Sequence, residues 1–170
     1  MRSTSVGKIY NCNQMRYYLN IGSNIGDREA NLKKAISIFS RNKGFRASAV
    51  VESEPWGFVS ANRFLNVGIA FDEDRLTPQQ MLTVVKWMEN EISLASHRTS
   101  GGEYADRVID IDIVAVDNLS VNTPRLTVPH PHLAKRDFFL KPLAELAPDW
   151  RHPATGLTAR QMLQAIEAPQ

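Results

Sequence analysis

The chain has 170 residues, of which 43% are hydrophobic and 22% are charged, the balance of a globular protein with room for one domain. No window approaches the ~18 uninterrupted apolar residues of a membrane-spanning helix, and the single cysteine, Cys12, excludes an internal disulfide and a zinc site built on cysteines. The net charge of +2 arises in residues 1–18, which hold basic side chains and no acidic one, so the nearly neutral remainder lacks the basic field of a nucleic-acid binder.

Residues 1–15 are polar, aperiodic and rich in Ser and Asn, and they lack the apolar region of a secretion signal. We therefore expect a disordered N-terminal extension followed by a single domain over residues 16–170. The expected protein is cytoplasmic and monomeric, with neither nucleic acid nor membrane as a partner.

In the first half of the chain, residues 16–21 have the composition of a strand and lead into a polar loop. Asp27 ends that loop as a suitable N-cap, and the spacing of the apolar residues after it predicts a helix that stops before Gly44. Two strands then follow without a helix between them, at 45–53 and 64–71.

In the second half, the Thr-Pro-Gln-Gln start at 77–80 predicts a capped helix with an apolar stripe along one face. A polar, glycine-containing loop at 96–105 separates this helix from residues 108–116, the strongest strand signal in the chain. We expect a hairpin near residues 117–118, then a segment rich in Pro and His, and a last helix opened by a capping box at 158–161.

The order strand–helix–strand–strand–helix–strand is the ferredoxin-like βαββαβ arrangement. Alternating strands and helices would also allow a doubly wound sheet, but the two consecutive strands between residues 45 and 71 count against it. The prediction is therefore an α+β sandwich in which helices pack on an antiparallel sheet.

The sharpest chemical feature is Asp110-Ile111-Asp112, which lies inside the strongest strand. Alternate residues of a strand project from one face, so the two carboxylates point the same way from backbones ~6–7 Å apart. At a sheet edge this pair would be a solvated polar face, but its β-branched, apolar flanks favour a central strand. A cation would then offset the charges, and two carboxylates can bridge a pair of Mg²⁺ ions ~3.5–4 Å apart, the spacing used in phosphoryl-type transfer.

A second feature is the turn bracketed by His130 and Arg136, which could both donate hydrogen bonds to phosphate oxygens. Two other interpretations of this segment are open. It could be a surface turn stiffened by its prolines, or a zinc site using His130 and His132, which no Cys and no third clustered His supports.

Three aromatic residues, Trp56, Phe64 and Phe138, lie beside polar residues near predicted loops. Aromatic side chains in such places usually mark the edge of a core, but a flat heteroaromatic ligand would need these stacking surfaces. The loop at 22–27 contains two glycines, yet it lacks the Lys-Ser/Thr pair of a phosphate-binding loop and is better explained as a helix entry.

Taken together, six segments resemble the 6-hydroxymethyl-7,8-dihydropterin pyrophosphokinase family of folate biosynthesis. They are G-S-N-I-G-D (22–27), S-E-P-W-G (53–57), F-L-N (64–66), D-R-V-I-D-I-D (106–112), L-T-V-P-H-P-H-L-A-K-R-D-F (126–138) and K-P-L-A-E-L-A-P (141–148). Each segment alone is modest, but their order and spacing are specific, and the resemblance covers about residues 17–166.

The resemblance implies a ferredoxin-like fold and transfer of diphosphate from MgATP, with two Mg²⁺ ions, to the hydroxymethyl oxygen of the pterin, releasing AMP. By position in the motifs, it implies catalytic roles for Arg107, Asp110, Asp112 and Arg98, the two aspartates being the metal ligands. The pterin contacts that it implies are Asn24, Ser53, Trp56, Phe64, Asn66 and Phe138. The ATP contacts that it implies are Glu91, Arg98, Arg107, Thr127, His130 and Arg136.

One departure from the family pattern concerns the phosphate clamp. The family usually follows its second long helix with Gly-Arg-x-Arg, whereas this chain reads Ala95-Ser96-His97-Arg98. Arg98 matches the second arginine, but Ser96 replaces the first, so that basic group is missing or supplied from elsewhere.

Two other classes of protein stay open at this point. A different D-x-D metal-dependent transferase would release a nucleoside diphosphate or free diphosphate in place of AMP. A ferredoxin-like binding module would show no Mg²⁺-dependent binding of ATP.

Overall fold

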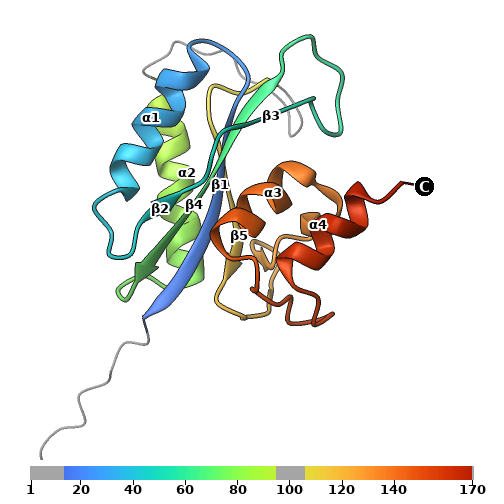
Figure 1. Cartoon of the computed structure of the whole chain (residues 1–170). Helices are drawn as coiled ribbons and strands as arrows, with labels where there is room; N and C mark the ends of the chain where they lie inside the picture. The colour runs from blue at the N-terminus through green and yellow to red at the C-terminus, as the bar shows by residue number, and fades with distance from the viewer. Residues whose placement is uncertain (1–13, 95–105, 170) are drawn as a thin grey trace, which may run out of the picture.

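The computed structural model of the chain describes residues 14–94 and 106–169. Its elements, in chain order, are β1 (Met15–Ser23), α1 (Arg28–Phe39), β2 (Arg46–Ala47), β3 (Val51–Ser53), β4 (Phe64–Glu73), α2 (Pro78–Leu94), β5 (Asp110–Val116), β6 (Val121–Asn122), β7 (Thr127–Val128), the 3-10 helix η1 (Leu133–Lys135), α3 (Asp137–Leu146) and α4 (Ala159–Glu167) (Figure 1). Within these residues, every helix is too short or too polar to cross a membrane.

One antiparallel sheet separates two layers of helices (Figure 1). β1 lies between β4 and β5, while β2 and β3 both pair with the other side of β4. α1 and α2 pack on one face of the sheet, and α3 and α4 lie on the other. This is the ferredoxin-like α+β sandwich that the sequence predicts, and the short β6–β7 hairpin lies outside the main sheet.

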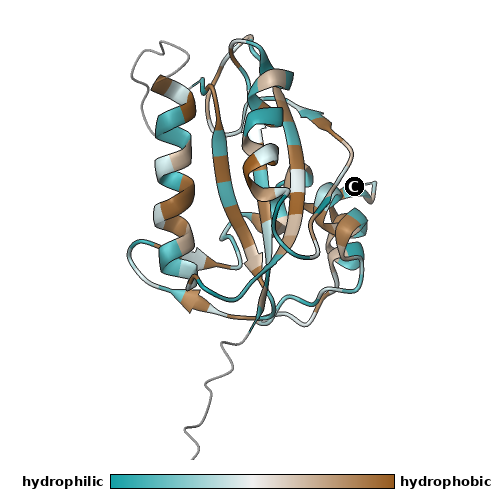
Figure 2. Ribbon diagram, turned by 90° about the vertical axis from the view of Figure 1, so that its left-hand side faces the viewer, coloured by the Kyte–Doolittle hydropathy of each residue, from teal (hydrophilic) through white to brown (hydrophobic). Residues whose placement is uncertain are grey.

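The alternation of side chains along β1 and β5 assigns each residue to one of the two helix layers. Apolar bands alternate with polar ones along the strands in Figure 2. The odd-numbered residues of β1, and those of β5 up to Ile113, pack against α1 and α2, among them Tyr17, Leu19, Ile21, Ile111 and Ile113. A bulge in β5 after Ile113 places Val116 on this face as well. The opposite face, toward α3 and α4, therefore receives Asp110 and Asp112, as the strand periodicity predicts.

The predicted caps are present at three helix starts. The Asp27 carboxylate accepts the N–H of Ala30 at the start of α1. At the start of α2, Thr77 and Gln80 exchange side-chain-to-backbone hydrogen bonds, and the same reciprocal box opens α4. These caps are contacts between neighbouring residues, so they define the helix starts without tertiary contacts.

β5 is an edge strand, so the expectation of a central strand for the aspartate pair is wrong. Among the described strands, β5 pairs with β1 alone. Its open edge is nevertheless covered, because the Ile111 N–H donates to Glu89 Oε1 at 2.7 Å and the Val114 carbonyl accepts the His130 N–H at 2.8 Å. The apolar flanks that favoured a central strand are buried by helix α2 and by the segment before η1.

The predicted strand at 45–53 is split into the short strands β2 and β3. Between them, the Ser48 hydroxyl accepts the N–H of Gly68 on β4, while the Ser48 N–H donates to the Gly68 carbonyl. A side chain thus takes the place of a main-chain acceptor, and the ladder is interrupted there.

Helix α3 has no counterpart in the sequence prediction. Pro142 lies inside it, and an internal proline removes a helical hydrogen bond and normally argues against a helix. The proline ring packs on the sheet at Gly68, where an added Cβ would come within 2.4 Å of the Pro142 Cβ. The helix therefore depends on a contact between residues far apart in the sequence.

Two further details differ from the sequence prediction. Residues 117–118 form a turn, with Asp117 at a φ of 43°, but β6 pairs with β7 and not with β5. Strand β1 begins at Met15, one residue before the expected start of this strand at residue 16. Residues 1–13 of the expected N-terminal extension lie outside the described residues.

Candidate active site

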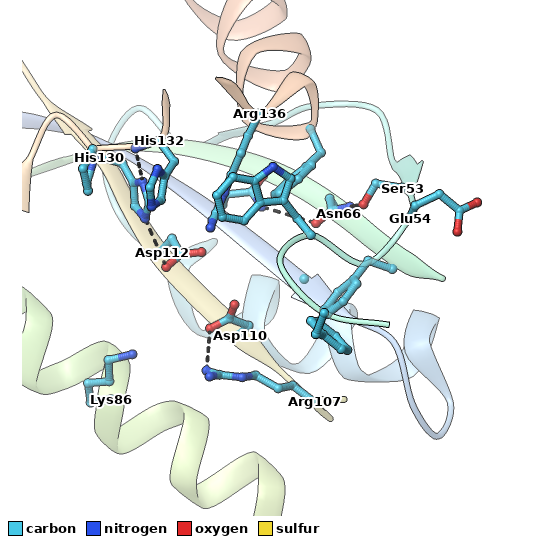
Figure 3. A pocket seen from close by; sticks show the side chains of 17 residues that line it. Ser53, Glu54, Asn66, Lys86, Arg107, Asp110, Asp112, His130, His132 and Arg136 are labelled. Atoms are coloured by element: carbon cyan, nitrogen blue, oxygen red, sulfur yellow. Dashed lines mark hydrogen bonds and ion pairs between the residues drawn. The ribbon is translucent and has the colours of Figure 1, made fainter. Parts of the chain in front are cut away.

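A cavity of about 350 Å³ lies on the α3 side of the sheet, where β1, β4 and β5 come together (Figure 3). Its lining comes from the sheet, from the loop after β3, from α2 and from the segment that leads into α3. The residues are Asn20, Gly22, Ser53, Glu54, Trp56, Phe58, Phe64, Asn66, Lys86, Arg107, Asp110, Asp112, His130, Pro131, His132, Arg136 and Phe138.

The structure brings most of the predicted site residues into this one cavity. They are Arg107, Asp110, Asp112, Ser53, Trp56, Phe64, Asn66, Phe138, His130 and Arg136. Arg107, Asp110 and Asp112 gather at the β5 side, whereas Ser53, Glu54 and Asn66 lie at the side of the loop after β3 (Figure 3), which also carries the aromatic residues Trp56 and Phe58. The cavity thus has a charged half and an aromatic half, with β1 between them.

The two aspartates occupy the floor of the charged half. Asp110 forms an ion pair with Arg107, whose Nη1 lies 3.2 Å from Asp110 Oδ1. Asp112 exposes a quarter of its side chain, and its Oδ1 lies 3.9 Å from His130 Nε2. Burial at the pocket floor, reinforced by the Asp110 carboxylate, raises the pKa of Asp112 to about 8.

The raised pKa of Asp112 indicates that Asp110 and Asp112 fit a divalent cation. A carboxylate that resists ionisation in the protein alone becomes a good ligand once a cation offsets its charge. The described residues contain no cluster of three or more His, Cys, Asp or Glu side chains that could hold a metal ion. Two carboxylates, with water and phosphate oxygens completing the shell, suit Mg²⁺ and do not suit zinc, so the zinc alternative finds no support.

His130 is held as a neutral imidazole of one tautomer. Burial, together with the charges of Arg136 and His132, lowers the pKa of His130 to about 3. Its Nδ1 accepts the main-chain N–H of His132 at 3.1 Å, which leaves the proton on Nε2. His130 therefore offers an N–H donor to the pocket without adding a positive charge.

Arg136 connects the charged half to the aromatic half. Its guanidinium carbon lies 4.2 Å from the ring centroid of Trp56 and 5.5 Å from that of Phe138. Trp56 also packs against His132 at 4.8 Å between ring centroids. An arginine that stacks on aromatic rings keeps its charge and its N–H groups directed while it is largely buried.

On the aromatic side, a chain of amides and a hydroxyl lies on the pocket floor. Asn66 Nδ2 donates to Ser53 Oγ at 2.8 Å and to the Val51 carbonyl at 3.2 Å. Asn66 Oδ1 accepts from Asn20 Nδ2 at 3.5 Å. Both asparagines are almost fully buried, so their orientation is set before any ligand binds.

Asn24 does not line the pocket, although the family motif predicts a pterin contact. Its Oδ1 accepts the Arg107 N–H at 2.6 Å, and its Nδ2 donates to Asp106 Oδ1 at 2.7 Å. Asn62 Nδ2 donates to the other Asp106 oxygen at 2.9 Å. Asn24 therefore connects the loop after β1 to residues 106–107, in the segment that leads into β5.

Two predicted ATP contacts also lie away from the pocket. Thr127 belongs to the β6–β7 hairpin, and Glu91 is exposed on α2. Two residues before Glu91, Glu89 binds the edge of β5, while Lys86 Nζ lies 3.2 Å from Glu89 Oε2. Glu89 follows the buried Val85 by four residues, so the helical period places Glu89, and not Glu91, on the side of α2 that faces the protein. Arg98 and Ser96 lie outside the described residues.

Sequence reasoning missed several lining residues, among them Asn20, Phe58 and Lys86. Asn20 carried a usable signal, because a polar residue inside the apolar run Tyr18–Ile21 must have a partner or a ligand. The sequence signal at Lys86 was weaker, because surface lysines are common on amphipathic helices.

Comparison with known proteins supports a single family. Residues 18–148 match the model of the 7,8-dihydro-6-hydroxymethylpterin-pyrophosphokinase family. A 2-amino-4-hydroxy-6-hydroxymethyldihydropteridine pyrophosphokinase of Porphyromonas gingivalis is 40% identical over 139 residues, which cover 80% of this chain and 92% of the relative. One of the same name from Methylorubrum extorquens is 39% identical over 155 residues, covering 89% and 94% of the two chains.

Solved structures show the same fold. A Plasmodium falciparum HPPK-DHPS structure aligns with a TM-score of 0.72 at 14% sequence identity, over 89% of this chain. The chain spans 45% of that longer protein.

Proposed function

The chain belongs to the 7,8-dihydro-6-hydroxymethylpterin-pyrophosphokinase family, and on this basis we propose how its cavity divides between two substrates. It is an ATP-dependent pyrophosphokinase of folate biosynthesis, which transfers diphosphate to the hydroxymethyl group of 6-hydroxymethyl-7,8-dihydropterin and releases AMP. In our proposal, the charged half of the cavity binds the triphosphate of ATP, and the aromatic half binds the pterin.

The observation that carries this division is the position of Asp112. Its carboxylate lies on the same floor as the buried amide of Asn20, its register partner on β1. Arg107 and Lys86 line the charged side, while Trp56 and Phe138 line the other. A hydroxymethyl group on a bound pterin would therefore lie next to the place where phosphate charge must be neutralised.

Asp110 and Asp112 would hold Mg²⁺, two ions in the proposal, and such ions supply neutralisation of charge on the transferred diphosphate. Arg107 and Arg136 would donate to phosphate oxygens, and neutral His130 would add a donor through Nε2. The aromatic rings of Trp56, Phe64 and Phe138 would enclose the pterin, whose ring edge would meet Ser53 and Asn66.

The hydroxymethyl oxygen is itself the nucleophile, so the protein needs no covalent one. That oxygen bonds to the β-phosphorus as the bond from this phosphorus to the oxygen of the α-phosphate breaks, and AMP leaves with that oxygen. The hydroxyl proton passes to solvent. Catalysis on this account is alignment and charge neutralisation, and exclusion of water from the cavity prevents hydrolysis of ATP.

A monomeric enzyme stays the prediction from sequence. The near-neutral body of the protein supports small molecules, and not nucleic acid, as its substrates. A location in the cytoplasm stays the prediction from sequence.

Calorimetric titration of two variants tests the division of the cavity. Asn66→Ala should weaken pterin binding by about 1–3 kcal/mol, because it leaves a buried pocket group unpaired, and should change ATP affinity little. Arg107→Ala should do the reverse. Loss of ATP binding with intact pterin binding in Asn66→Ala would show that the two halves are assigned the wrong way round.

A further inference from the structure

Asn20 is a buried polar residue in the middle of an otherwise apolar strand. It exposes 4% of its surface, and it faces the cavity between Asp112, its register partner on β5, and Asn66 on β4. A polar side chain that is buried in a sheet is costly unless each of its groups finds a partner.

The hydrogen-bond chain on the pocket floor fixes which way the Asn20 amide points. The Val51 carbonyl can only accept, so Asn66 must turn its Nδ2 toward Val51 and its Oδ1 toward Asn20. Asn20 must then present its own Nδ2 to Asn66. Asn20 Oδ1 is consequently turned away from Asn66, and within the described residues it has no hydrogen-bond partner.

A buried water does not readily satisfy this oxygen. The small void behind Asn20, about 10 Å³, is lined almost wholly by apolar side chains such as Leu143 and Phe139. A buried water needs two to four polar partners and at least ~10–15 Å³ of such space. Asn20 also lines the cavity, so the remaining source of a donor is a ligand bound there, which reaches the covered oxygen after a small rotation of the amide.

We infer that Asn20 Oδ1 is a substrate-binding group that accepts a hydrogen bond from an N–H or O–H of the bound pterin. This inference rests on the proposed function. Phosphate oxygens carry no such donor at neutral pH, whereas a hydroxymethyl-dihydropterin carries ring N–H groups and a hydroxyl. The acceptor therefore favours the pterin over a misplaced phosphate at the boundary between the two halves of the cavity.

The test is calorimetric titration of 6-hydroxymethylpterin into the protein saturated with Mg²⁺ and α,β-methylene-ATP. Asn20→Leu keeps the branched shape of the side chain and removes its polar atoms. Ser48→Ala is the matched control, because Ser48 is a buried polar residue beside β4 that does not line the cavity. Each variant is also melted with and without the nucleotide.

For Asn20→Leu we expect the Kd for the pterin to rise about tenfold, with the nucleotide Kd changed less than about twofold. Its Tm should change little, because removal of a buried acceptor without a partner is offset by loss of the donor to Asn66 Oδ1. Ser48→Ala should lower the Tm and leave both Kd values unchanged.

Three outcomes would overturn the inference. A pterin Kd within about twofold of the wild-type value would show that Asn20 makes no contact with the substrate. A change in nucleotide or Mg²⁺ affinity alone would place its oxygen on the metal side. Failure of the wild-type complex to bind the pterin at all would instead refute the proposed function, and the inference with it.

Discussion

The carboxylate of Glu89 accepts the main-chain N–H of Ile111 at 2.7 Å, at the point of β5 that lies between the two aspartates. Glu89 therefore serves as the hydrogen-bond partner that a neighbouring strand would otherwise supply on this edge. Burial raises the pKa of Glu89, and the Lys86 ammonium, 3.2 Å away, partly offsets this rise. Helix α2 thus fixes the strand that presents Asp110 and Asp112 to the cavity.

Removal of this contact should cost stability and also disturb the site. In Glu89→Ala the Ile111 N–H loses its buried acceptor, so we expect the free energy of unfolding to fall by about 1–3 kcal/mol. Glu91→Ala, two residues along the same helix, removes an exposed carboxylate and should leave stability and ATP affinity unchanged. Denaturant unfolding of both variants measures the difference, and equal stabilities would mean that Glu89 does not support β5.

The raised pKa of Asp112 predicts a pH-dependent gain of stability in Asp112→Asn without divalent cations. The folded chain binds a proton here more tightly than the unfolded chain, whose aspartate pKa is near 3.8. The contribution of Asp112 to the free energy of unfolding is therefore complete below about pH 4 and is lost as the pH rises to about 8.

The difference in Tm between Asp112→Asn and the wild type should accordingly grow from pH 5 to pH 8.5. Asp149→Asn, at an exposed position, should show no such trend. A difference that is constant across this range, or that shrinks, would contradict the raised pKa.

The lowered pKa of His130 predicts an imidazole that stays neutral in mildly acidic solution. Nitrogen-15 NMR should show a protonated Nε2 and an unprotonated Nδ1, with no conversion to the imidazolium form between pH 8 and pH 5. The effect of His130 on the pH dependence of stability is opposite to that of Asp112. The unfolded histidine binds a proton below about pH 6.5 and the folded one does not, so His130 lowers the free energy of unfolding as the pH falls. Titration of His130 near pH 6.5 would refute the assignment of a neutral donor.

Arg98 lies outside the described residues, so its predicted role rests on the sequence alone. If it carries the charge that Ser96 does not, Arg98→Ala should lower kcat more than it raises KM for ATP, because a residue of this kind acts mainly in the reacting complex. Arg75→Ala, at an exposed position far along the chain, is the control. An unchanged kcat in Arg98→Ala would move the role to another basic residue, with Arg107 the first candidate.

The features that the sequence predicted well are those set by neighbouring residues. The period of β5 placed Asp110 and Asp112 on one face, and the caps at Asp27 and Thr77 marked helix starts. The features that it missed depend on contacts between distant segments. Glu89 covers the edge of β5 from 22 residues away, and the Pro142 ring needs the bare backbone of Gly68.

The same distinction explains the two asparagines of the first strand and loop. The motif Gly-Ser-Asn drew attention to Asn24, yet its amide is used by Arg107 and Asp106 within the protein. Asn20 reaches the cavity, because the pairing of β1 with β4 and β5 places it between Asn66 and Asp112. That pairing is long-range, so the local pattern could indicate that Asn20 needs a partner but not that it lines the cavity.

The most direct test of the central claim is product analysis by phosphorus-31 NMR, after incubation of the protein with MgATP and 6-hydroxymethyl-7,8-dihydropterin. The wild type should form AMP and pterin diphosphate in equal amounts. Asp110→Asn and Asp112→Asn should form neither while they keep their circular dichroism spectra, because each loses a metal-binding carboxylate at the transferred diphosphate. Formation of ADP with a pterin monophosphate, or near-normal turnover in either variant, would contradict the account.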